Sequence, residues 1–195
     1  MVSPIIVLIG MTAAMAASAL AIDFTPRESV RELDGARFSE LIFTDGHSDV
    51  SYEPPAAWSY HGEKNLLTLW EPARQQVDAR IVVTDSGVTP IALDGPGMKL
   101  VRARAQSILP RGSEEVRFLS EAKNAVMIDG QDTYEATFEY GLFGQMSRTC
   151  VLFAFLGNRL VTIQVSAHPE DFAEAYRAFH RSLFSLQWHK AGTRG

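Results

Sequence analysis

Residues 131–167 read QDTYEATFEYGLFGQMSRTCVLFAFLGNRLVTIQVSA and have the clearest strand pattern in the chain. In 131–140, apolar and polar residues alternate with a period of two, the pattern of a β-strand with one buried and one wet face. The run 150–156 is apolar throughout, as in a strand covered on both faces. Glycine-containing turns flank this run, at 141–144 and at 157–158. The stretch therefore predicts three consecutive antiparallel strands joined by two tight hairpins.

Shorter patterned segments surround this stretch. Strands are expected at 38–44, 49–53, 66–70, 77–84 and 115–120, with a short edge strand at 184–188. One helix is expected at 98–109, and a second begins near Pro169 and buries an apolar stripe that includes Phe172 and Phe179. Helices are too few for alternating βαβ units. The expected fold class is α+β: a mostly antiparallel, curved β-sheet of about six to eight strands, with a middle helix and a C-terminal helix packed on it.

Composition narrows the functional classes. The chain has 195 residues, 46% of them hydrophobic and 21% charged, which fits one globular domain. The net charge of −5 argues against a nucleic-acid-binding domain. A single cysteine excludes an intramolecular disulfide and any multi-cysteine metal site. The sequence also lacks a P-loop, a GxSxG turn and an HExxH pair, so we expect neither an enzyme nor a cofactor.

Residues 1–21 form an uncharged, apolar segment that ends in Ala19-Leu20-Ala21. Small residues two apart after an apolar core suit signal peptidase, so we expect a cleaved signal peptide and export to the periplasm or the exterior, with no stable membrane span after cleavage. A retained N-terminal membrane anchor is the alternative, because the run is just long enough to cross a bilayer. The remaining chain is expected to divide into a lead-in at 22–36, either a short helix or extended, one domain at 37–188, and a disordered tail at 189–195.

The layout resembles the PsbP/Mog-type fold. The residues that carry the resemblance are Tyr52-Glu53-Pro54-Pro55-Ala56-Ala57-Trp58, the three-strand run at 131–167, and the ending from His168-Pro169-Glu170-Asp171-Phe172 to Leu183-Phe184-Ser185. The resemblance covers about residues 38–188. It implies a binding or assembly module, because most members of this fold have that role and many are exported. It transfers no functional residue and no photosystem role, since a shared fold does not carry function.

Candidate binding residues lie at three places. Leu142 and Phe143, between two glycines, would form an apolar hairpin tip that either invites a partner or a membrane surface, or folds back over the sheet edge. Lys99 and Arg102 lie on the basic side of the middle helix, which either faces an acidic partner or is simply solvated. Trp58, with Trp70 and Trp188, either lines a ligand cleft or fills the core.

A metal site is not expected, although Asp45, His47 and Asp49 place two carboxylates and an imidazole within five residues. The Asp45-Gly46 pair is typical of a solvated turn, which is the simpler interpretation. Cys150 begins the most apolar strand and is expected to be a buried, inert thiol.

The sequence thus predicts an exported, non-enzymatic binding or assembly module of the cell envelope that has a protein partner of unknown identity. Two alternatives stay open. One is a carrier of small apolar ligands that uses the tryptophans. The other is a metal-dependent envelope hydrolase that uses His47 with Asp45 or Asp49.

Overall fold

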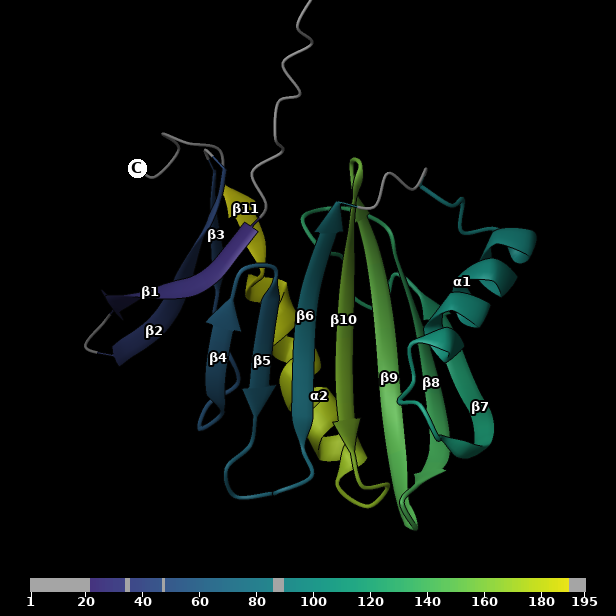
Figure 1. Ribbon diagram of the computed structural model, residues 1–195. Coiled ribbons are helices and arrows are strands. Elements are labelled where there is room, and N and C mark those ends of the chain that lie inside the picture. Colours follow the sequence, from purple (N-terminus) through teal and green to yellow (C-terminus); the bar gives the residue numbers. More distant parts are fainter. Residues whose placement is uncertain (1–21, 34–35, 47, 86–89, 190–195) are drawn as a thin grey trace, which may run out of the picture.

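A computed structural model describes residues 22–33, 36–46, 48–85 and 90–189 of the protein. They form two antiparallel sheets and two helices (Figure 1). The seven-stranded sheet runs, in spatial order, β4 (Ser59–Glu63), β5 (Leu66–Trp70), β6 (Asp78–Asp85), β10 (Arg159–Ala167), β9 (Gln145–Leu156), β8 (Thr133–Leu142) and β7 (Glu114–Lys123). The four-stranded sheet runs β1 (Ile22–Leu33), β2 (Ala36–Asp45), β3 (Ser48–Tyr52) and β11 (Gln187–His189). The helices are α1 (Gly95–Ser107) and α2 (Phe172–Ser182), and a 3-10 turn, η1 (Leu183–Ser185), follows α2.

The seven-stranded sheet is the middle layer of the molecule. One face packs against α2 and the four-stranded sheet, in a core that includes Phe24, Phe43, Ile163 and Phe179. The opposite face packs against α1, in a second core that includes Val101. Figure 1 shows α1 and α2 on opposite sides of the large sheet. Burial of apolar side chains on both faces explains why the central strands have no polar face.

The three-strand prediction for 131–167 is confirmed. β8, β9 and β10 pair in sequence order, and all the pairs are antiparallel. Residues 150–154 of β9 are buried, as expected for a strand covered on both sides. The α+β class is also confirmed, with seven strands in the larger sheet and two packed helices.

The N-terminal part of the described chain differs from the prediction. Residues 22–33 are extended rather than helical, and they are more than a lead-in: they form strand β1, which pairs with β2. Ile22 and Phe24 alternate into the core, and the Phe24 ring meets Phe43 edge-on at 5.0 Å between centroids. Pro26, which has no N–H to donate, lies where the pairing of β1 with β2 is irregular. The chain therefore enters the fold at residue 22, well before residue 37, and builds a second sheet that the sequence did not predict.

Two further expectations were wrong. The polar side of β8 is not fully wet: Thr133 is 1% exposed and its hydroxyl donates to the Val126 carbonyl oxygen, and Glu139 is 6% exposed between two arginines. His189 does not belong to a disordered tail, since it lies in β11 and its Nε2 is 2.8 Å from Ser51 Oγ. The predicted signal peptide at 1–21 and the rest of the tail, 190–195, lie outside the described residues.

Within the described ranges, no helix combines the length and the apolar character that a membrane crossing requires.

Candidate functional site

The hairpin tip (residues 142–145) joins β8 to β9 by a two-residue turn. Leu142 pairs with Gln145, and the two residues between them both have positive φ, +51° at Phe143 and +76° at Gly144. Two positive φ angles define a type I′ turn, whose first position usually holds Asn, Asp or Gly. A bulky L-residue in the left-handed region costs about 1 kcal/mol. The tip therefore carries its phenylalanine at a position where stability favours a small residue.

Phe143 is also the most solvent-exposed large apolar side chain among the described residues. It is 93% exposed, against 63% for the next, Leu100. Leu142, by contrast, is half-buried and packs against the core beneath α1. The two residues thus divide the expected roles: Leu142 folds back onto the domain, and Phe143 points into solvent. Neither packing nor turn chemistry accounts for an aromatic ring at this place.

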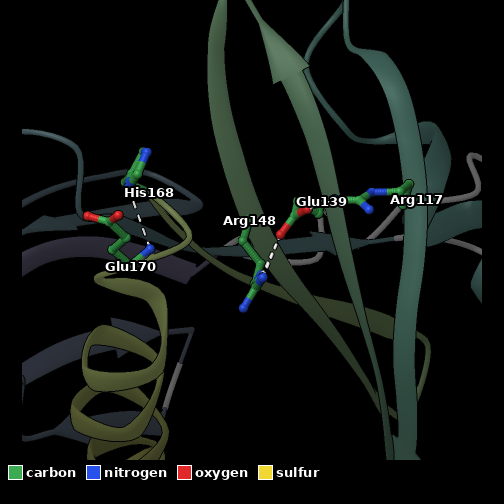
Figure 2. Close-up of polar contacts among 5 residues, drawn as sticks. All are labelled: Arg117, Glu139, Arg148, His168 and Glu170. Atoms are coloured by element: carbon green, nitrogen blue, oxygen red, sulfur yellow. Dashed lines mark hydrogen bonds and ion pairs between the residues drawn. The ribbon is translucent and has the colours of Figure 1, made fainter.

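Charged side chains fix the base of the same hairpin. Glu139 of β8 lies between Arg148 of β9 and Arg117 of β7 (Figure 2). Arg148 donates from Nη2 and Nε to Glu139 Oε2, at 2.5 and 3.1 Å, and Arg117 donates to Oε1. We call these three residues the Glu139 cluster. The guanidinium of Arg148 also lies 5.7 Å from the centre of the Phe172 ring, so the cluster connects three strands to α2.

The end of β10 reaches the same region. Figure 2 shows His168 and Glu170 at the turn into α2, where the Glu170 backbone N–H donates to His168 Nδ1 at 3.5 Å. Arg148 pairs with Ala167, the last residue of β10. The hairpin is therefore held at its base from both neighbouring strands, and the tip is presented on a rigid support.

The Glu139 cluster predicts a pH dependence of stability. Arg148, and then Arg117, hold the pKa of Glu139 below its usual value of 4.5. Because the folded-state pKa is the lower one, the cluster stabilises the fold above about pH 4.5, and this contribution is lost as the pH falls through the folded-state pKa. We expect Glu139→Gln to lower the free energy of unfolding at pH 7 and to have a much smaller effect at pH 3. Chemical unfolding of both proteins at the two pH values measures this, and an equal difference at both would contradict it.

Acidic residues lie next to the tip. Glu114 opens β7 opposite Gly141, and Glu115 follows it; both are exposed. A Cβ atom added to Gly141 would lie 3.7 Å from the Glu114 carbonyl oxygen, which shows how closely the two strands approach. The exposed ring of Phe143 thus stands beside two exposed carboxylates.

The other expected binding residues do not join the tip. Trp58 is 9% exposed and its ring stacks on Phe179 at 6.0 Å, so it fills the core. Arg102 binds Glu121 through Nε at 2.9 Å and lies 4.4 Å over the Phe118 ring. Lys99 is exposed on α1.

The tryptophans do not share a cleft either. Trp70 is partly exposed where β5 ends, whereas Trp58 stays within the core. Trp188 borders a separate cavity beside β11. The structure therefore gives no support to a carrier site lined by all three rings.

The two carboxylates of the expected metal cluster are each engaged by an arginine. Asp45 accepts from Arg159 Nη1 at 2.6 and 2.5 Å and from Trp188 Nε1 at 2.7 Å. Asp49 accepts from Arg27 Nη2 at 2.7 Å. His47 lies outside the described residues. Across the described part of the chain, no group of three or more His, Cys, Asp or Glu residues could hold a metal ion.

The burial expected for Cys150 is confirmed. Its residue is 3% exposed, and burial together with the charge of Glu135 raises the pKa of the thiol well above its usual range. The thiol therefore stays protonated at neutral pH and is a poor nucleophile.

A scan against protein-family models and a search of curated proteins each found no match. Similar solved structures include a protein of unknown function from Pseudomonas aeruginosa, at 13% identity and a TM-score of 0.47, with 82% of this chain and 96% of that chain covered. A Bacteroides thetaiotaomicron protein matches at 12% identity and a TM-score of 0.47, over 75% of this chain and 47% of that chain. A cyanobacterial PsbP from Synechocystis sp. PCC 6803 matches at 10% identity and a TM-score of 0.48, over 91% and 98%. A PsbP is thus among the structures to which this chain is similar, and likeness at this level assigns no role to any residue.

Proposed function

We propose that this protein is an exported, non-enzymatic binding or assembly module that docks on a protein partner through the tip of its β8–β9 hairpin. One observation carries the proposal: Phe143 is 93% exposed and sits at a φ of +51°. Backbone strain at Phe143 lowers the stability of the fold, and an exposed apolar ring lowers solubility. A role of this ring in binding explains why the position nevertheless holds a phenylalanine. Aromatic anchors of this kind dominate the energy of many interfaces.

The charges near the tip favour a protein over a lipid bilayer as the partner. Glu114 and Glu115 lie beside the tip, and the whole chain carries a net charge of −5. Three carboxylates and two arginines lie at or just below the tip, so this region has no excess of positive charge to hold it on an anionic membrane surface, and one aromatic ring is a small anchor for a bilayer. The partner surface that fits is an apolar pocket with basic residues at its rim.

The rigid base of the hairpin supports the same proposal. The Glu139 cluster holds β7, β8 and β9 together directly below the tip. A pre-organised anchor loses little conformational entropy when it binds, which strengthens an interface of modest area. The role in the envelope rests on the apolar segment at 1–21 and its small-residue ending.

Phe143→Asn tests the proposal, because asparagine suits the first position of a type I′ turn. We expect the free energy of unfolding to rise by about 0.5–1 kcal/mol, since the strained ring is replaced by a residue that tolerates positive φ. We expect capture of the partner from the native cell envelope to fall at least about 30-fold, the loss typical of an interface hot spot. Affinity capture with quantitative mass spectrometry measures the second effect.

Leu100→Asn is the matched control, since Leu100 is 63% exposed on α1. It should leave capture unchanged. If Phe143→Asn folds normally and still captures the same protein in the same amount, the tip is not the docking surface. Flotation of the wild-type protein with anionic or zwitterionic lipid vesicles, abolished by Phe143→Asn, would instead identify a membrane surface and overturn the choice of a protein partner.

A further inference from the structure

A cleft lies at the opposite end of β9 from the hairpin tip. β9 has 12 residues, which is roughly 40 Å of extended chain, so the two places are independent surfaces. The cleft has a volume of about 330 Å³, within the range of small-molecule sites. Its polar and aromatic lining comes from four separate segments: Ser48, Asp129, Gln131, Arg159, Trp188 and His189.

Buried partners hold the main side chains of this sheet-end cleft in place. Asp45, whose side chain is 5% exposed, binds both Arg159 and Trp188 from behind. Ser51 holds His189 through its hydroxyl group, at 2.8 Å. The Trp188 backbone N–H donates to Asp129 Oδ1 at 3.4 Å. Side chains held in place by a supporting layer are a feature of built binding sites.

These partners also determine what each side chain can offer to a ligand. The indole N–H of Trp188 is already bound to Asp45, so what remains for a ligand at this residue is its apolar ring. Asp45 binds Arg159 through Nη1 only. The Nε and Nη2 groups of Arg159 have no hydrogen-bond partner among the described residues, so they can donate to a ligand. Asp129 keeps its second carboxylate oxygen as an acceptor. Gln131 can both donate and accept.

The charges in the cleft nearly cancel. The positive charge of Arg159 is matched by Asp45, which leaves Asp129 as the one remaining formal charge when His189 is counted as neutral. A strongly anionic ligand would be repelled by Asp129, and a cation without acceptor groups would leave the unused N–H donors of Arg159 unsatisfied. The mixture of hydrogen-bond donors and acceptors in the cleft suits an uncharged ligand with many groups that can both donate and accept hydrogen bonds.

We propose that the sheet-end cleft binds a neutral sugar. Each hydroxyl group of a sugar both donates and accepts hydrogen bonds, which matches Arg159, Gln131 and Asp129 together. The C–H face of a pyranose ring is apolar and packs on aromatic rings such as that of Trp188. The chemical class is therefore carbohydrate, and the site is separate from the hairpin tip.

Titration of the full chain with chitotriose, maltotriose and cellotriose tests this inference. Binding should be saturable with at least one of the three, and should perturb tryptophan fluorescence and the NMR signals of Trp188 and Gln131. Gln131→Ala and Asp129→Asn should each weaken binding at least fivefold. Both residues are exposed, and asparagine tolerates the positive φ of +49° at residue 129, so the variants should fold.

Gln106→Ala is the matched control, because Gln106 is an exposed glutamine on α1 and does not line the cleft. It should bind as the wild type does. The inference is overturned if none of the three sugars binds up to 10 mM, or if binding is the same in both cleft variants as in the control. Tighter binding of benzyltrimethylammonium or benzoate than of any sugar would show a site for ions and would overturn it as well.

Discussion

Removal of the Asp45 carboxylate is expected to lower the free energy of unfolding by about 3–5 kcal/mol, the range for breaking a buried ion pair from one side. The Asp45 side chain is 5% exposed, and it accepts hydrogen bonds from Arg159 and from the indole of Trp188. Asp45→Ala would leave the 23%-exposed guanidinium without its counter-charge and the indole N–H without an acceptor. It would also loosen β2 from β10 and β11, which these bonds connect. Denaturant unfolding at pH 7 measures the loss.

Asp49→Ala provides the comparison within the same hairpin. Asp49 also accepts from an arginine, Arg27, but the two side chains are 38% and 63% exposed. An exposed pair contributes about 0–1 kcal/mol, so this variant should lose clearly less stability than Asp45→Ala. Similar losses for the two variants would mean that the Asp45 network does not hold the sheets together.

Gly62→Ala is expected to cost about 3 kcal/mol or more, because it forces two backbones apart. A Cβ atom on Gly62 would lie 1.8 Å from the carbonyl oxygen of Phe24 and 2.8 Å from its carbonyl carbon. The Phe24 backbone N–H donates to the Lys64 carbonyl at 2.7 Å, so β1 lies directly against β4 here. No side-chain rotation can relieve a clash with backbone. The strand must shift, and Phe24 then leaves a core where it is fully buried.

Gly95→Ala is the control for this glycine. Gly95 starts α1, and a Cβ atom there would meet nothing within 4 Å. The free energy of unfolding of the Gly95→Ala variant should differ from that of the wild type by less than about 1 kcal/mol. Any change should be an increase, because alanine has a higher helix propensity than glycine. If Gly62→Ala unfolds at the same denaturant concentration as Gly95→Ala, the close contact of β1 with β4 is not part of the folded protein.

Local patterning explains which parts of the fold the sequence predicts. β8, β9 and β10 follow one another with tight turns, so each strand's partner is its neighbour in the chain and the period of two is easy to read. β1 contains Pro26 and only a few alternating apolar positions, and its burial depends on β2 and on the distant β4. A strand whose stability comes from distant partners leaves a weak local signal.

The same distinction applies to the candidate sites. The tip is visible in the sequence because Gly141 and Gly144 enclose two apolar residues. The two-residue turn also fixes the register of the hairpin, in which Glu139 lies opposite Arg148. This register was not used in the sequence analysis, and the ion pair was missed. Arg117 could not be found in this way, since two irregularities in β7 displace its register. The sheet-end cleft depends on Arg159 and Trp188, which lie 114 and 143 positions from Asp45, and no local pattern connects them.

If the hairpin tip is the docking surface, Phe143 contacts a protein partner in the cell. The most direct test replaces Phe143 with a photoreactive phenylalanine analogue in cells that make the protein, with the same analogue at Leu100 as the control. We expect one cross-linked protein product from position 143, and we expect that this product is not formed from position 100. No protein product from position 143, or the same products from both positions, would contradict the claim that the hairpin tip is the docking surface.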